Sequence, residues 1–294
     1  MFKYILFIFL SILSGRILAQ PVSVQADYNA MGDCLFSAYN NTKVPMFLNV
    51  DLADLENTVF TETVPYVKRL EPGFNSLFTL YRDPEEDVPR FNYQMKVFRS
   101  NPVAKVDLKF PYLLPFAEGR TIEVFDVKNI DGFWGQEGLE SWYATGFTAE
   151  SGEEVFACRN GLVAEVVGAE RSGDAANWYH TWTKSITLLH DDGTLICYHN
   201  VLDSGNKLKV GEKVYAGQVI GKVAANENTV LILIWHDSLF TKSPRFIIPH
   251  FVTGEGTQDI LISTQEYKIL HPVDIVGLEM SSKEKRKILS NKKN

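Results

Sequence analysis

Residues 143–166 read YATGFTAESGEEVFACRNGLVAEV, and this stretch indicates the fold of the second half of the chain. Apolar and polar residues alternate along it, and Arg159-Asn160-Gly161 interrupts the alternation as a tight hairpin would. Two later segments, Asp191-Asp192-Gly193 and VGEKVYAGQVIG at 210–221, place glycines where strands would turn. Because such glycines permit turns and close backbone approach, we expect a small, barrel-like antiparallel sheet here.

The segment from residue 20 to residue 115 shows the same period-2 alternation in shorter runs, separated by Pro and Gly breakers. Regularly spaced short strands predict a β-sandwich, and we expect an immunoglobulin-like one. No long helical period follows residue 19, so the predicted fold class is all-β. The predicted organisation is a sandwich at 20–115, a second β-domain at 116–253 and a C-terminal extension at 254–294.

Residues 1–19 combine a short basic start, the apolar run ILFIFLSIL and a small residue at Ala19, which is the pattern of a signal peptide. The run is too short to span a bilayer, and no cysteine follows it for a lipid anchor. We therefore expect an exported protein, periplasmic or extracellular, with no stable membrane span after cleavage. The formal net charge of −7 argues against nucleic acid as a partner.

The C-terminal tail and the cysteines leave alternatives open. The basic tail at 281–294 either contacts an anionic wall or membrane surface or frays into solvent. Cys158 and Cys197 lie in expected strands of one domain, so an oxidising compartment permits a bridge between them, although spacing alone does not establish one. The third cysteine, Cys34, has no assigned role.

Four motifs in the second half follow one another in a recognisable order. They are Gly152-x-x-Val155-x-Ala157-x-x-x-Gly161-x-Val163, Ile186-x-Leu188-x-His190-x-Asp192-Gly193, Cys197-Tyr198-His199 and Val210-Gly211-x-x-Val214-x-x-Gly217-x-x-Ile220-Gly221. Their combination resembles the lysostaphin/LytM-type zinc endopeptidases, which cut peptide cross-bridges in peptidoglycan. The last motif alone also resembles a biotinyl or lipoyl carrier, but the Met-Lys-Met tripeptide of such carriers is absent.

The resemblance implies three zinc ligands and an open position for water. The family's His-x-x-x-Asp pair falls on Trp142 and Gly146, neither of which coordinates a metal. Its His-x-His strand falls on 229–237, TVLILIWHD, with Leu231 and Leu233 as the likeliest matches. A shifted register would instead place Ile234 and His236 there. Only His199 matches a catalytic position of the family, as its auxiliary histidine, so the resemblance implies a degenerate member without a metal site.

A relocated zinc site and an aromatic binding loop are the remaining site hypotheses. The candidate ligands for relocation are His180, His190, His199, His236 and Asp237, which show no i, i+2 or i, i+4 ligand spacing. The insertion at 169–184 holds Trp178, Tyr179 and Trp182, which with His199 are the candidate binding residues. Clustered loop aromatics either grip a sugar or protein partner or pin a long hairpin to its own domain.

Three functions remain after this comparison. The first is a catalytically inactive binding or regulatory module at the cell envelope, with peptidoglycan or an envelope protein such as a wall hydrolase as its partner and no cofactor. The second is an active zinc-dependent peptidoglycan endopeptidase with relocated ligands, in which case zinc is the cofactor. The third is a structural envelope protein without a ligand. The missing ligands favour the first and third over the second.

Overall fold

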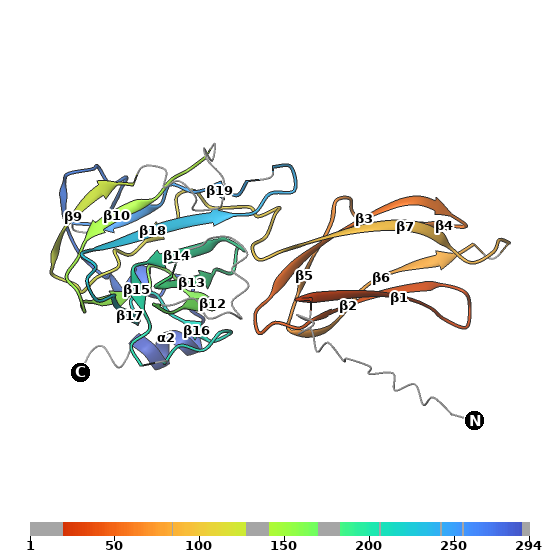
Figure 1. Ribbon diagram of the computed structural model, residues 1–294, viewed down its shortest axis with the longest axis horizontal. Coiled ribbons are helices and arrows are strands. Elements are labelled where there is room, and N and C mark those ends of the chain that lie inside the picture. Colours follow the sequence, from red (N-terminus) through yellow and green to blue (C-terminus); the bar gives the residue numbers. More distant parts are fainter. Residues whose placement is uncertain are drawn as a thin grey trace, which may run out of the picture.

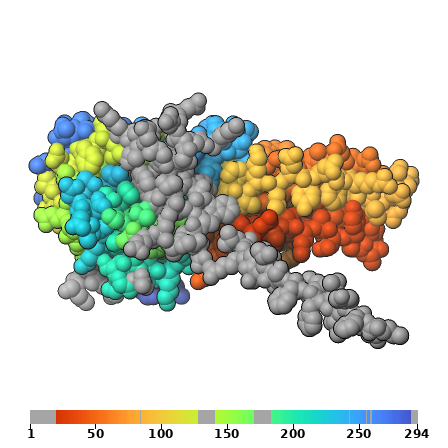
Figure 2. All heavy atoms as spheres, viewed as in Figure 1, coloured from red at the N-terminus to blue at the C-terminus, as the bar shows by residue number. Residues whose placement is uncertain are grey.

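The computed structural model describes residues 20–83, 85–127, 141–169, 183–205, 207–241, 243–254 and 256–289. Two predicted features lie outside these residues, namely the signal segment 1–19 and the aromatic candidates Trp178, Tyr179, His180 and Trp182. The described chain forms two lobes that lie end to end and in direct contact (Figures 1 and 2). Strands dominate both lobes, and the only described helices are α1 (Val273–Val276) and α2 (Ser282–Leu289), so the all-β class is confirmed. Neither helix has the length and hydropathy that crossing a bilayer requires.

The first lobe, called the sandwich lobe, is made of two sheets with a shared apolar core. One sheet has the order β1-β2-β6-β4 and the other the order β5-β3-β7. Their strands are β1 (Val22–Tyr28), β2 (Cys34–Asn40), β3 (Met46–Glu56), β4 (Thr58–Val59), β5 (Tyr66–Leu70), β6 (Gly73–Arg82) and β7 (Arg90–Phe98). Inward residues of both sheets, such as Phe36, Leu48 and Phe78, form the core, and the rings of Phe36 and Phe78 stack at 4.5 Å. The immunoglobulin-like topology of this sandwich stays a prediction.

The second lobe is built on a nine-stranded sheet with the order β16-β12-β13-β14-β18-β10-β9-β22, and β19 pairs with β18 at its side. The strands are β9 (Thr121–Asp126), β10 (Thr145–Thr148), β12 (Gly161–Val167), β13 (Ser185–Leu189), β14 (Leu195–His199), β16 (Lys213–Val214), β18 (Thr229–His236), β19 (Arg245–Phe246) and β22 (Glu266–Lys268). Two small sheets cover one face. They contain β11 (Glu154–Phe156), β17 (Val219–Val223) and β15 (Val201–Leu202), and β21 (Thr257–Asp259), β20 (His250–Thr253) and β8 (Pro111–Tyr112).

The central strand β18 is apolar on both faces because both faces are covered. Its even-numbered residues Val230, Ile232 and Ile234 enter the main core of the lobe, beneath the small sheets. Its odd-numbered residues Leu231, Leu233 and Trp235 belong to a second apolar cluster on the opposite face. We call this opposite face the ligand face, since it carries the positions that the sequence comparison assigned to metal ligands.

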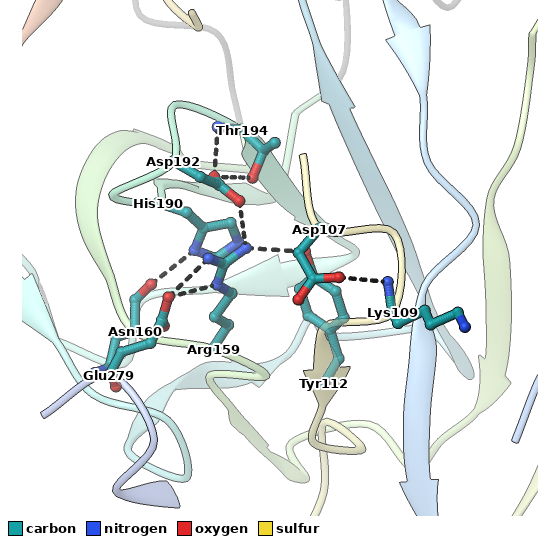
Figure 3. Close-up of polar contacts among 9 residues, drawn as sticks. All are labelled: Asp107, Lys109, Tyr112, Arg159, Asn160, His190, Asp192, Thr194 and Glu279. Atoms are coloured by element: carbon teal, nitrogen blue, oxygen red, sulfur yellow. Dashed lines mark hydrogen bonds and ion pairs between the residues drawn. The ribbon is translucent and has the colours of Figure 1, made fainter. Parts of the chain in front are cut away.

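The C-terminal extension packs against the second lobe through Arg159 (Figure 3). The guanidinium of Arg159 donates to Asp192 Oδ2 at 2.8 Å and to Glu279 Oε1 at 2.7 Å. It also lies 3.7 Å from the ring centroid of Phe110, and the Arg159 side chain is only 5% exposed. The buried arginine is thus neutralised by two carboxylates, one of which belongs to the extension.

Residues 282–289 form helix α2, so this part of the tail is not frayed, although most of its side chains are exposed to solvent as that alternative expected. Glu284 in the first turn of the helix accepts hydrogen bonds from Lys213 Nζ at 2.8 Å and from the Tyr215 hydroxyl at 2.9 Å. Ile288 packs near Val276 in a small apolar cluster. The short, charged sequence of this segment does not by itself indicate a helix. Contacts with residues distant in sequence therefore stabilise it.

All three cysteines are free and buried. Cys158 belongs to the main core of the second lobe, whereas Cys197 belongs to the cluster on the ligand face. The two therefore lie on opposite sides of the sheet and form no bridge. Cys197 lies in β14 as expected, whereas Cys158 lies in the turn between β11 and β12 and not in a strand. Burial raises the pKa of each of these two thiols to about 12, which keeps them protonated.

Candidate functional site

The assigned ligand positions meet in one row across the nine-stranded sheet. Gly146 on β10 pairs with Leu231 on β18, and Leu231 pairs with His199 on β14. On its other side Gly146 pairs with Phe125 on β9. Directly paired residues of antiparallel strands present their side chains on the same face. The strand register thus brings Phe125, Gly146, Leu231 and His199 together on the ligand face.

Gly146 has no room for a side chain because the ring of Phe125 occupies that space. A Cβ placed on Gly146 would lie 2.7 Å from Cδ2 of Phe125, and closer still to the next two ring atoms. No real Cβ tolerates such distances. Phe125 was not among the sequence candidates, although it belongs to the alternating run IEVFDV at 122–127. The aromatic ring fills the volume that a ligand carboxylate at position 146 would need.

Leu231 and Leu233 complete an apolar surface on this face. Leu231 is 8% exposed and Leu233 is fully buried, and both belong to the cluster with Leu195, Cys197 and Trp235. The shifted register would use Ile234 and His236 instead. Ile234, however, points into the main core on the other side of the sheet, and His236 Nδ1 lies 2.7 Å from the carbonyl oxygen of Asp237. Of the two alternative pairs, Leu231 and Leu233 are therefore the one that lies on the same face of the sheet as His199.

Trp142 is packed as a structural side chain at the edge of the same cluster. Its indole Nε1 donates to the carbonyl oxygen of Val127 at 3.0 Å. Its ring lies 5.2 Å from that of Phe246, centroid to centroid. A tryptophan whose ring is packed and whose single donor is satisfied has no remaining polar atom for a metal.

The sandwich lobe contacts one end of the second lobe, where β14 begins and β18 ends, four residues along these strands from His199 and Leu231. Phe47 on β3 alternates with Met46 and Leu48, yet it belongs to the cluster on the ligand face and not to the core of the sandwich. Phe98, at the end of β7, packs against the same cluster. In Figure 1 the start of β3 and the end of β7 lie toward the second lobe. Sequence reasoning missed both phenylalanines, since each reads as an ordinary strand residue.

Polar contacts fix the sandwich lobe in this position. Arg99 Nη1 lies 3.1 Å from Glu165 Oε1. Ser100 Oγ donates to Asp237 Oδ2 at 2.7 Å and accepts from the Asp237 backbone N–H at 2.5 Å. The next residue, Asn101, donates its backbone N–H to the carbonyl oxygen of Gly193 at 2.8 Å. Three consecutive residues after β7 thus each bond to the second lobe.

Of the histidines proposed for a relocated metal site, His180 lies outside the described residues, and the described ones, His190, His199 and His236, belong to no metal-ligand group. His190 is buried, and its Nδ1 lies 2.7 Å from the carbonyl oxygen of Asn160, on the side of the sheet away from His199. Burial, with the nearby charge of Arg159, holds the pKa of His190 well below its usual value. Across the described residues there is no group of three or more His, Cys, Asp or Glu side chains arranged to hold a metal ion.

The zinc ion that the resemblance implies does not fit the described residues of the ligand face. A hydrated dication needs nitrogen, oxygen or sulfur donors. Around His199 the neighbouring positions instead carry a glycine covered by Phe125 and two leucines in an apolar cluster. Such surroundings disfavour a charged ion, because it would lose water without gaining ligands.

Comparison with known proteins identifies the second lobe. Residues 140–237 match the model for peptidase family M23. No curated protein sequence matches the chain. Among solved structures, the catalytic domain of lysostaphin from Staphylococcus simulans is 22% identical, with a TM-score of 0.27, over 39% of this chain and 84% of that one. The deep-sea M23 metalloprotease pseudoalterin is 14% identical, with a TM-score of 0.32, over 55% and 97% respectively.

Helicobacter pylori Csd3 is 12% identical, with a TM-score of 0.32, over 88% of this chain and 55% of that one. At these identities and TM-scores the structural likenesses support no conclusion about function. The family match rests on residues 140–237, which include β10, the central strands and the ligand face. The chain therefore contains a domain of peptidase family M23, of the lysostaphin/LytM type, in which the described residues include no metal-ligand group.

Proposed function

We propose that this protein is an exported, non-catalytic member of its family that acts as a binding or regulatory module at the cell envelope. We propose three parts for it, 20–115, 116–253 and 254–294, of which the first contributes β8 and the last contributes β21 and β22 to the sheets of the second lobe. The observation that carries the proposal is the packing of the Phe125 ring over Gly146. The ring occupies the space that the side chain of a metal ligand at position 146 would need. Peptidoglycan, or an envelope protein such as a wall hydrolase, is the proposed partner.

The apolar character of the ligand face supports the same proposal. A peptidase needs polar donors for its metal on the face that admits the peptide. Here Leu231 and Leu233 on that face belong to an apolar cluster. A partner is therefore expected to bind another surface of the molecule.

The test combines metal analysis with an assay on purified sacculi. Protein purified without chelator is expected to contain substoichiometric zinc and to release no peptidoglycan fragments, while it co-sediments with sacculi or with an envelope partner. The His199→Ala variant is expected to match the wild type in zinc content and in the lack of fragment release, because without a metal His199 has no hydroxide to assist. Stoichiometric zinc together with fragment release that His199→Ala abolishes would refute the proposal and favour the active-enzyme alternative. Absence of binding to sacculi and to envelope extracts would leave the structural alternative.

A further inference from the structure

The outer face of the β1-β2-β6-β4 sheet carries exposed aromatic side chains in one strip. Tyr39 and Phe74 are directly paired across β2 and β6 and are 51% and 70% exposed. Further along β6, Tyr81 is paired with Val59 of β4, and these are 63% and 72% exposed. Residues 34, 36, 78 and 80 point inward, so the strip belongs to the opposite, solvent-facing side. Two pairs of large exposed apolar side chains on one sheet face indicate a binding surface.

At its Tyr81 end the strip opens into a hollow of about 550 Å³. Its other walls are polar and include Asn57, Thr58, Thr61, Asp83 and Glu86. Arg82 is the one cation among the described residues that line it, and its Nε donates to the carbonyl oxygen of Glu86 at 2.7 Å. The hollow thus offers an aromatic wall beside hydroxyl, amide and carboxylate groups.

The polar groups on β2 and β6 between the two ends of the strip are neutral, and β1 adds one charge to this face, the exposed carboxylate of Asp27 beside Leu35. On β2 and β6 the outward positions between the aromatic pairs are Leu35, Ser37, Ser76 and Thr79. Hydroxyl and carboxylate groups bind the hydroxyls of an uncharged ligand, while aromatic faces pack against its apolar surface. The carboxylates of Asp83 and Glu86, beside an Arg82 already engaged by a backbone carbonyl, disfavour a phosphorylated or otherwise anionic ligand.

From this surface we infer a binding site for a neutral glycan strand, running from the Tyr81 hollow along β6 to Tyr39 and Phe74. This inference rests on the proposed function, because it assigns the envelope-binding role to the sandwich lobe. It also agrees with the apolar ligand face, where the described residues form no metal-ligand group. A peptide or protein partner is the competing outcome.

The test measures binding of the full-length protein to a soluble β-1,4-linked N-acetylglucosamine hexamer by calorimetry, with sacculus co-sedimentation alongside. Tyr81→Ala and Phe74→Ala are each expected to weaken hexamer binding by about tenfold, as truncation of a central aromatic anchor does. The control is Phe240→Ala, which removes an 80% exposed aromatic from the second lobe and should leave binding unchanged. Because all three side chains are exposed, melting temperatures should remain near that of the wild type.

The outcomes separate the two proposals. No binding of the hexamer, or equal binding by wild type, Tyr81→Ala and Phe74→Ala, would overturn the glycan site. If the protein still sediments with sacculi in that case, the envelope function stands and the contact lies elsewhere. If stem peptides compete for the Tyr81 surface and the hexamer does not, the site is a peptide site and the inference is wrong.

Discussion

Replacement of Gly146 by alanine tests whether Phe125 truly fills the former ligand position. The new Cβ would lie 2.7 Å or less from three atoms of the Phe125 ring, so the ring must move within a packed cluster. Overpacking of this kind costs about 1–3 kcal/mol. The lower entropy of the unfolded chain offsets about 0.4–1 kcal/mol of that loss. The expected net decrease in the free energy of unfolding is therefore about 1–2 kcal/mol.

A matched control lies in the same sheet. A Cβ on Gly161 would meet Leu188 Cβ and the Leu189 carbonyl oxygen at 3.1 Å, so these neighbours must give by only a few tenths of an ångström. Gly161→Ala is therefore expected to cost less than Gly146→Ala, about 1 kcal/mol or below. Urea unfolding, followed by circular dichroism with equal slopes for all variants, measures both changes.

The decisive measurement is a double-mutant cycle with Phe125→Ala. Phe125→Ala alone should cost about 2 kcal/mol, less than a fully buried phenylalanine because its ring is only partly buried. In the double variant the methyl group introduced at position 146 enters the space that the ring has left, so the two losses should fall short of their sum by about 1–2 kcal/mol. Additivity within about 0.5 kcal/mol would show that the ring does not fill this position, and would refute the reasoning.

Three further changes probe contacts elsewhere. Ser100→Ala removes a donor to the buried Asp237 carboxylate and an acceptor for its N–H, and should lower the free energy of unfolding by about 1–3 kcal/mol in urea titrations. Arg159→Met leaves two carboxylates without their cation and should cost about 3–5 kcal/mol in the same assay. His190, whose pKa is lowered from 6.5 by burial, binds a proton more readily in the unfolded chain. Stability should thus fall as pH decreases below 6.5, by about 1.4 kcal/mol per pH unit, and His190→Gln should remove that component.

Each of these changes has a control of the same type at a less buried position. Ser76→Ala, Arg69→Met and His250→Gln alter side chains that are exposed or only partly buried. They should change the free energy of unfolding by no more than about 0.5 kcal/mol. If Ser100→Ala or Arg159→Met is equally mild, the corresponding contact does not stabilise the fold. If the free energy of unfolding of the His190→Gln variant falls with decreasing pH as steeply as that of the wild type, a group other than His190 titrates in this range.

Local alternation predicted the strands well. The assignment of Leu231 and Leu233 to ligand positions came from the family resemblance and stays a prediction. That these two side chains share a face could be predicted from the sequence, because they lie two apart on one strand. The contact between Phe125 and Gly146 could not, since it depends on how β9 pairs with β10, and alternation within a strand carries no information about its partner. Helix α2 escaped prediction for a similar reason, because its Glu284 is held by Lys213 and Tyr215 from a distant turn.

The loss of the ligands is spread over several positions of one apolar cluster. The odd-numbered residues of β18 belong to that cluster, so a histidine at position 231 or 233 would place an imidazole among apolar side chains. An aspartate at position 146 would collide with Phe125. Recovery of a metal site would therefore require new donors at several positions and removal of Phe125. Because no one of these steps is sufficient by itself, Trp142 and Gly146 are parts of the internal packing of the second lobe, through Phe246 and Phe125 respectively.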